Sequence, residues 1–427
     1  MRIILNPARE EWDLLCRRPA IPRDDLEKTV GAIMEKVRNE GDTALRSYAE
    51  QFDKVKLSSL RVSAEEFELA AATLGNDLKS SIRAAYDNIY TFHLAQQPRT
   101  LRVETMSGVV CQRVPRPISP VGLYIPGGGA PLFSTVLMLG IPARIAGCEE
   151  VILCTPPARD GSIHPAILFA ATMCGIRNVF KCGGAQAIAA MASGTASIPA
   201  VNKIFGPGNQ YVTCAKQMAA ANGTAIDLPA GPSEVLVIAD DSADPSFVAA
   251  DLLSQAEHGE DSQVVLVTDS EWLPAMVLTE VERQLESLPR QDAARKSLQH
   301  SLCVIMPSLE DGIAFSNTYA PEHLIMNFTG AAELLPKVIH AGSVFIGPWT
   351  PESAGDYASG TNHTLPTGGF ARSSSGVSVD SFTRYMTVQE ISPDGLRILG
   401  PVVETMAEAE SLHAHRRAVT IRLNKLS

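Results

Sequence analysis

Short apolar segments alternate with longer helical segments from about residue 120 onward, and this alternation constrains the fold more than any other feature. The apolar segments include VILCTP (151–156), EVLVIAD (234–240) and SQVVLVTD (262–269), and each has the length of a strand. Alternating strands and helices predict parallel sheets with helices on both faces. We therefore expect an α/β protein with two Rossmann-like parallel-sheet lobes, a helical N-terminal region and an extended helical C-terminal segment.

Changes in this pattern give the expected boundaries along the chain. DDLEKTVGAIMEKVRNEGD (24–42) has the apolar spacing of a helix and opens a helical region. ETMAEAESLHAHRRAV (404–419) predicts a polar helix, and TIRLN (420–424) predicts a short strand after it. The expected parts are an N-terminal arm (1–23), a helical region that packs with the second lobe (24–122), a first α/β lobe (123–233), a second α/β lobe (234–377) and a C-terminal segment (378–427).

Composition and charge argue against several classes of function. The formal net charge of the 427-residue chain is −11, so electrostatic binding to nucleic acid is not expected. No run of about 18 apolar residues is present, so we expect no membrane span, and the N-terminus lacks the apolar core of a secretory signal. The eight cysteines form no C-x-x-C motif and lie mostly in apolar segments, which favours buried, reduced thiols in a cytoplasmic protein.

Three glycine-rich turns each follow an apolar strand and precede a helix: YIPGGGAP (124–131), KCGGAQA (181–187) and FGPGNQY (205–211). Glycine lets a phosphate approach the main chain, and the start of a helix favours negative charge. No turn completes the G-x-G-x-x-G dinucleotide pattern, because Tyr211 stands where the third glycine would be. The turns are therefore either structural or nucleotide-binding. If a nucleotide binds, the polar side chains nearest to the turns are Tyr124, Gln186 and Asn209.

The stretch SQAEHGEDSQ (254–263) carries a glutamine and a histidine at the expected end of a helix. Gln255 and His258 are spaced i, i+3, so they share one helical face, and Gly259 suits the position that ends a helix. Two such side chains can hold a borderline metal such as zinc. They also fit an ordinary polar helix terminus, and the spacing alone leaves both interpretations open.

Other polar residues stand beside apolar segments. Glu322 and His323 are adjacent in YAPEHLIM (319–326), and a Glu–His pair suits proton transfer because histidine titrates near neutral pH. Each residue also has a structural interpretation, as a helix cap, a hydrogen-bonded loop histidine or a solvated helix face. No H-E-x-x-H or paired C-x-x-C zinc motif is present. The remaining candidates are Ser233 before an expected strand, Asp356 and His363 in a loop, and Glu410 and His415 in the polar C-terminal helix.

Taken in order, these motifs resemble the histidinol dehydrogenase family. The resemblance runs from about residue 24 to residue 423. It is specific, because several ordered motifs from separate parts of the chain match. The matching motifs are YIPGGGAP, GGAQAIAA, FGPGN, PAGPSEVLVIAD, DLLSQAEHG, PEHL, SAGDYASGTNH-x-LP and E-x-L-x-A-H.

The resemblance implies a role for each candidate residue. It implies one zinc ion per subunit, held by Gln255, His258, Asp356 and His415. It implies an acid–base pair of Glu322 and His323, and NAD⁺ contacts from Tyr124, Gln186 and Asn209. It implies a homodimer whose C-terminal segment reaches the neighbouring subunit's site. Substrate contacts are implied for Ser233, Gln255, His258, His323, Asp356, Glu410 and His415.

The activity implied by the resemblance is the four-electron oxidation of L-histidinol to L-histidine through bound L-histidinal, in the last steps of histidine biosynthesis. Three alternatives are open at this point. A paralogue would oxidise another small polar alcohol with zinc and NAD⁺. A zinc hydrolase or lyase would use the same metal ligands without a nucleotide. A regulatory protein would bind a nucleotide without catalysis.

Overall fold

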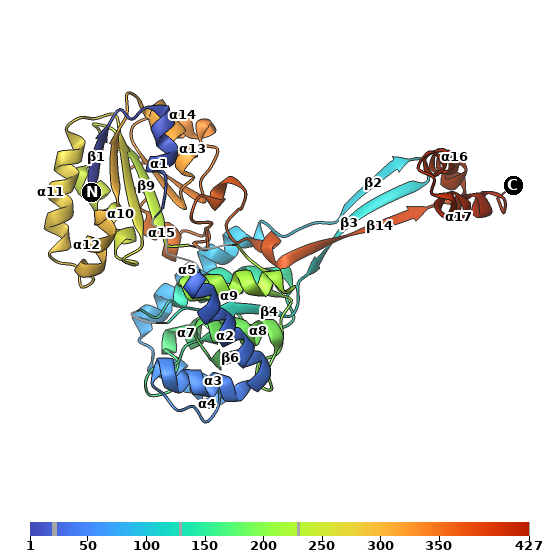
Figure 1. Cartoon of the computed structure of the whole chain (residues 1–427), viewed down its shortest axis with the longest axis horizontal. Coiled ribbons are helices and arrows are strands. Elements are labelled where there is room, and N and C mark those ends of the chain that lie inside the picture. Colours follow the sequence, from blue (N-terminus) through green and yellow to red (C-terminus); the bar gives the residue numbers. More distant parts are fainter. Residues whose placement is uncertain (19–23, 128–129, 229–230, 427) are drawn as a thin grey trace.

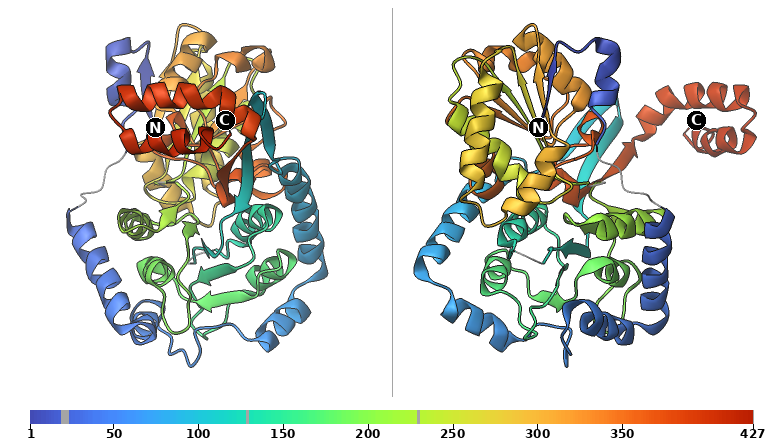
Figure 2. Two further views of the ribbon diagram at one scale, coloured as in Figure 1. Left: turned by 90° about the vertical axis from the view of Figure 1, so that its right-hand side faces the viewer. Right: turned by 60° about the vertical axis from the view of Figure 1, so that its left-hand side comes forward.

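The computed structural model describes residues 1–18, 24–127, 130–228 and 231–426 (Figure 1). Two α/β lobes lie next to each other, and a narrow ribbon of strands ending in two helices projects away from them (Figures 1 and 2). Gly128 and Gly129 of the first glycine turn, Pro229 and Ala230 before Ser233, and residues 19–23 of the N-terminal arm lie outside the described residues. In the described part of the chain, no helix is both long and apolar enough to cross a membrane.

The first lobe contains a five-stranded sheet in which every pairing is parallel. Strands burying both faces alternate their side chains between two cores. Leu153 packs with one core, whereas Ile152 and Cys154 pack with the other. In sheet order the strands are β6 (Asn178–Lys181), β5 (Val151–Thr155), β4 (Val121–Tyr124), β7 (Lys203–Phe205) and β8 (Ala225–Ile226). Helices α6 (Phe133–Ala146) and α7 (Pro165–Met173) cover one face, and α8 (Gly184–Ser193) and α9 (Gln210–Ala221) cover the other.

The N-terminal helices pack against this first lobe, so the expectation that region 24–122 packs with the second lobe is wrong. Helix α2 (Asp24–Glu40) contacts α8 and α9, α4 (Ala64–Thr73) contacts α7, and α5 (Asn76–Leu94) contacts α6. The reason is that the helices beneath are apolar on most sides; α6, for example, buries ten consecutive residues, 134–143, and needs a second layer to cover them. A short α3 (Asp42–Tyr48) continues the layer, with the π-helical turn Ala49–Asp53 after it.

The second lobe contains a six-stranded sheet that is parallel throughout. Its first strand comes from the N-terminal arm and pairs with β11 at the sheet edge. In sheet order the strands are β1 (Arg2–Leu5), β11 (Leu302–Ile305), β10 (Gln263–Thr268), β9 (Glu234–Ala239), β12 (His323–Asn327) and β13 (Ser343–Ile346). The helices are α1 (Trp12–Leu15), α10 (Pro245–Ala256), α11 (Leu273–Leu285), α12 (Gln291–Gln299), α13 (Leu309–Tyr319), α14 (Ala331–Leu334) and α15 (Glu352–Tyr357).

The projecting arm is a three-stranded antiparallel sheet ending in a helical hairpin (Figure 1). Its strands are β2 (Leu101–Met106), β3 (Val109–Pro117) and β14 (Thr383–Ile391), and its helices are α16 (Pro393–Ala409) and α17 (His413–Leu423). The expected strand TIRLN is therefore wrong, because α17 continues through Leu423. Leu423 packs on α16 at Gly400: a Cβ added to Gly400 would stand 2.8 Å from a methyl carbon of Leu423. Packing of one helix on another has overridden a local preference for strand.

Candidate active site between the lobes

A cavity of about 640 Å³ lies between the two lobes and is lined by residues of both. The first lobe contributes the turn Gly206–Asn209, which follows the carboxyl end of β7. The second lobe contributes His323 at the amino end of β12 and Ser233 just before β9. A cavity of this size suits a small molecule. The glycine turn 206–209 therefore faces the polar residues of the second lobe across one space.

The adjacent Glu322 and His323 are both buried at the start of β12. Glu322 Oε2 accepts a hydrogen bond of 3.0 Å from the main-chain N–H of Glu234. His323 Nδ1 lies 2.9 Å from Gln255 Nε2 and 3.2 Å from the carbonyl oxygen of Glu234. The other ring nitrogen, Nε2, lies 3.5 Å from Asp356 Oδ1. The imidazole therefore has one nitrogen fixed by the protein and the other directed at the carboxylate cluster.

The surroundings of this pair change the proton affinity of both groups. Burial raises the pKa of Glu322 to about 8, although the neighbouring imidazole opposes the shift. Burial alone would lower the pKa of His323, but the nearby carboxylates of Glu322, Glu352 and Asp356 outweigh it and raise that pKa to about 10. The pair therefore retains a proton more strongly than the free side chains would, as expected for groups that exchange protons with a bound molecule.

Three donors suited to a metal ion line the same cavity as this pair. Gln255 lies in the last turn of α10, His258 follows that helix, and Asp356 lies on α15; all three line the cavity. Gln255 Oε1 is buried and has no hydrogen-bond partner among the described residues. Partial desolvation lowers the pKa of His258, which favours the neutral form that binds metals. An orphaned amide oxygen, an imidazole and a carboxylate fit a zinc ion that takes a further ligand.

Two residues of the site had only weak sequence signals. Glu352 is buried near His323, with 3.9 Å between Glu352 Oε1 and His323 Nε2. One side-chain atom from each of Glu352, His323 and Asp356 lies close enough to the other two to bind the same metal ion. The only sequence signal for Glu352 was a spacing of four residues from Asp356. His363 lines the cavity with Nε2 3.5 Å from Thr135 Oγ1. The sequence predicts only a histidine in a loop at this position, and the spacing indicates no role for it.

Of the three residues expected to contact the cofactor, one lines the cavity and two are buried behind its wall. Asn209 lines the cavity, and its side-chain oxygen caps α9 by accepting hydrogen bonds from the N–H groups of Tyr211 and Val212. Tyr124 and Gln186 are buried outside the cavity wall. The Tyr124 hydroxyl accepts a hydrogen bond of 3.1 Å from the N–H of Gly184.

Glu410 directly follows α16 and His415 lies on α17, so both belong to the helical hairpin of the projecting arm. Neither residue lines the cavity of its own chain. Both are exposed. The structure thus leaves these two residues apart and brings the other second-lobe candidates together around the cavity: Ser233, Gln255, His258, Glu322, His323, Asp356 and His363.

Known proteins are similar to this chain in sequence over nearly its whole length. The family model described as histidinol dehydrogenase matches residues 16–423. Histidinol dehydrogenase of Bacteroides thetaiotaomicron is 57% identical over 426 residues, covering 100% of each chain. Histidinol dehydrogenase of Vibrio cholerae is 55% identical over 425 residues, covering 99% of this chain and 97% of that protein.

Similarity in three dimensions is equally extensive. The crystal structure of histidinol dehydrogenase from Elizabethkingia anophelis has a TM-score of 0.97 and 52% sequence identity, and the match covers 100% of this chain and 98% of that chain. Sequence and fold agree along the full length, so the chain belongs to the histidinol dehydrogenase family.

Proposed function

We propose that this chain oxidises L-histidinol to L-histidine through bound L-histidinal, reducing two molecules of NAD⁺. The observation that carries the proposal is that the buried Glu322–His323 pair opens onto the same cavity as Gln255, His258 and Asp356. Groups able to transfer protons and groups able to hold a metal therefore face one space of small-molecule size. Membership of the family supports the choice of substrate.

We further propose that Gln255, His258 and Asp356 hold zinc, with His415 of the partner subunit as the fourth ligand. The buried and unpartnered Gln255 Oε1 supports this assignment, because an unsatisfied buried oxygen is costly without a ligand. When bound, zinc would supply positive charge and open positions that orient the imidazole and amine nitrogens of histidinol. A metal on Asp356 would also offset that carboxylate, bringing the pKa of His323 closer to the range of a general base.

In the first oxidation, His323 takes the proton of the substrate alcohol. NAD⁺, when bound, would accept the hydrogen of the alcohol carbon as hydride. Nε2 is the nitrogen suited to this task, because Nδ1 lies against Gln255 and Glu234. The product of this step is the aldehyde and one NADH.

In the second oxidation, Glu322 or His323 takes one proton from water as the water oxygen attacks the aldehyde carbon, which leaves the monoanion of the hydrate. A second NAD⁺, when bound, would accept the hydride of this anion, and the resulting carboxylic acid then loses its proton to give the carboxylate. Burial raises the pKa of Glu322 to about 8, so this carboxyl can both release and accept a proton near neutral pH.

The remaining contacts complete the substrate and cofactor sites. We propose that Ser233, Gln255, His258, His323 and Asp356 contact the substrate, together with Glu410 and His415 of the partner subunit. We propose that NAD⁺ is contacted by Tyr124, Gln186 and Asn209. Asn209 would meet the cofactor at the cavity wall, whereas Tyr124 holds the neighbouring turn at Gly184.

The proposed shared site requires a homodimer, and the projecting arm supports one. Apolar side chains that are at least two-fifths exposed lie on its strands and helices; they include Leu101, Val103, Ile398, Val402, Met406 and Ile421. An exposed apolar stripe on a thin extension needs a partner surface to cover it. We also propose a cytoplasmic location, because a reducing compartment suits the buried thiols of Cys154 and Cys174, which form no disulfide.

The proposed function is tested by NADH stoichiometry with purified protein, zinc and limiting L-histidinol. We expect two NADH per L-histidinol and L-histidine as the product. The matched variant Glu322→Gln should slow the aldehyde step more than the alcohol step, whereas His323→Asn should slow both. No NADH with L-histidinol, but NADH with another small polar alcohol, would instead identify a paralogue with a different substrate.

A further inference from the structure

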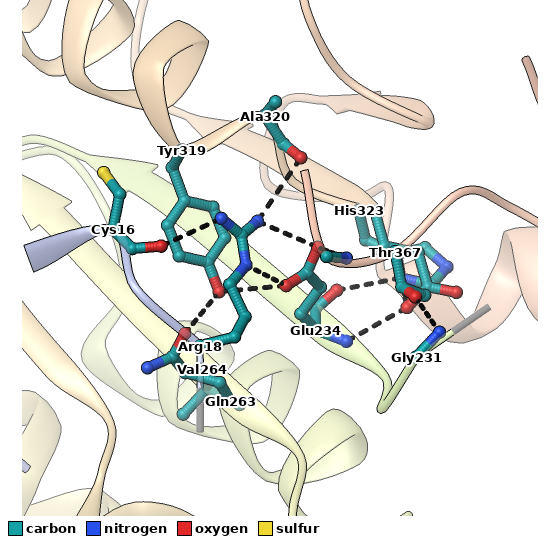
Figure 3. A network of polar contacts seen from close by, with 12 residues as sticks. Cys16, Arg18, Gly231, Glu234, Gln263, Val264, Tyr319, Ala320, His323 and Thr367 are labelled. Carbon is teal, nitrogen blue, oxygen red and sulfur yellow. Dashed lines mark hydrogen bonds and ion pairs between the residues drawn. The ribbon is translucent and has the colours of Figure 1, made fainter. Parts of the chain in front are cut away.

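The carboxylate of Glu234 is buried beneath the acid–base pair, yet it has no role in the chemistry described so far. Glu234 begins β9, and its side chain is only 1% exposed. Arg18 donates to both carboxylate oxygens, from Nε at 2.7 Å and from Nη2 at 3.0 Å (Figure 3). The N–H of Gly368 donates at 2.9 Å, and the Tyr319 hydroxyl lies 3.2 Å away. A two-point arginine contact of this kind fixes both distance and orientation.

Arg18 is itself held in place on several sides. Its guanidinium lies over the Tyr319 ring, with 3.6 Å between the guanidinium carbon and the ring centre. Its Nη1 donates to the carbonyl oxygen of Cys16 at 3.0 Å (Figure 3). The arginine belongs to the N-terminal arm, which is 216 residues from Glu234 in sequence. The ion pair therefore ties the arm, β9 and α13 together beside the cavity, which Arg18 also lines.

The main chain of the same Glu234 contacts the proposed catalytic groups. Its N–H donates to Glu322 Oε2 at 3.0 Å. Its carbonyl oxygen lies 3.2 Å from His323 Nδ1 and accepts a hydrogen bond of 3.3 Å from Gln255 Nε2. β9 and β12 are neighbours in the sheet, with Val235 opposite His323. A displacement of Glu234 would therefore reach both members of the acid–base pair.

We propose that Glu234, held by Arg18, is a positioning residue that sets the orientation of Glu322 and His323 through its main chain. This inference rests on the proposed function of that pair. The physical reason is that a buried carboxylate clamped at both oxygens cannot turn or slide, so the peptide groups on either side of it are held as well. A misplacement of about 1 Å in a catalytic group can lower a rate by about a hundredfold.

The test uses Arg18→Lys, Glu234→Gln and the double variant Arg18→Met/Glu234→Gln. The lysine keeps the charge but loses the two-point contact, and the double variant leaves no buried charge unpaired. We expect kcat with L-histidinol to fall about tenfold to a hundredfold, while KM changes less than about threefold and zinc content is unchanged. The matched control is Glu66→Gln, which removes the Lys181–Glu66 ion pair of 2.6 Å in the first lobe. It should leave kcat unchanged.

If the Arg18–Glu234 ion pair were purely structural, its removal would lower the stability of the fold without lowering kcat selectively. The decisive measurement is a double-mutant cycle with Glu322→Gln. If Glu234 acts through Glu322 and His323, Glu234→Gln should reduce kcat less in the Glu322→Gln background than in the wild type. Equal losses in both backgrounds, or wild-type kcat in the folded double variant Arg18→Met/Glu234→Gln, would overturn the inference. Failure of the wild type to oxidise L-histidinol would refute the proposed function instead, so the two failures are distinguishable.

Discussion

Replacing Gly206 by alanine should disrupt the turn that faces the cavity from the first lobe. Gly206 has a φ of +125°, and an added Cβ would stand 2.1 Å from the carbonyl oxygen of Tyr124. The turn cannot easily move away, because the Gly206 N–H donates to Asp227 Oδ2 at 2.7 Å and its carbonyl accepts from Lys216 Nζ at 2.9 Å. The positive φ costs about 1–3 kcal/mol. Each hydrogen bond to a charged partner contributes about 1.5–3 kcal/mol, so we expect a loss of roughly 4 kcal/mol or more.

The measurement is urea unfolding of Gly206→Ala beside the control Gly223→Ala. Gly223 also has a positive φ, +99°, but no atom lies within 4 Å of its added Cβ, so the control should lose only about 1–3 kcal/mol. The Gly206 variant should also raise the KM for NAD⁺, because Asn209 lies on the same turn. If the two variants lost the same free energy of unfolding, the turn would be free to relax, and the reasoning from the Tyr124 contact would be wrong.

Three further outcomes are expected from changes elsewhere. His258→Asn should lose bound zinc and turnover while keeping the fold, and full zinc occupancy by metal analysis would contradict the ligand assignment. Mixing inactive His415→Ala and His258→Ala subunits in equal amounts should restore about a quarter of wild-type activity, because half of the dimers are mixed and each has one intact site; no recovery after verified exchange would rule out the shared site. Burial raises the pKa of Asp53 to about 6, above its value in the unfolded chain. Ionisation of Asp53 therefore destabilises the fold; this destabilisation is absent near pH 4 and complete above pH 6. Asp53→Asn should therefore stabilise the fold by about 1 kcal/mol at pH 8, after allowance for partial exposure, and not at pH 4; equal effects at both pH values in urea unfolding would contradict this account.

The local pattern of the chain was enough to predict the two parallel-sheet lobes. The strands β5 (Val151–Thr155) and β9 (Glu234–Ala239) bury side chains on both faces, so nearly every residue in them is apolar and the sequence shows a short apolar run. The adjacency of Glu322 and His323 and the i, i+3 spacing of Gln255 and His258 are likewise local. The resemblance added the association of these separate motifs, which spacing alone did not establish.

Tertiary structure alone decided which surfaces meet. Periodicity shows that α2 and α5 have an apolar face, but it does not say which lobe that face covers, because both lobes offer apolar helices. Arg18 and Glu234 are 216 residues apart in sequence, so no local spacing pattern in the sequence indicates their contact. The separation of Glu410 and His415 from their own cavity depends on the antiparallel pairing of β14 with β3, which directs the helical hairpin away from the lobes (Figure 2). Long-range pairings of this kind are set by how complete elements pack, and no local pattern encodes them.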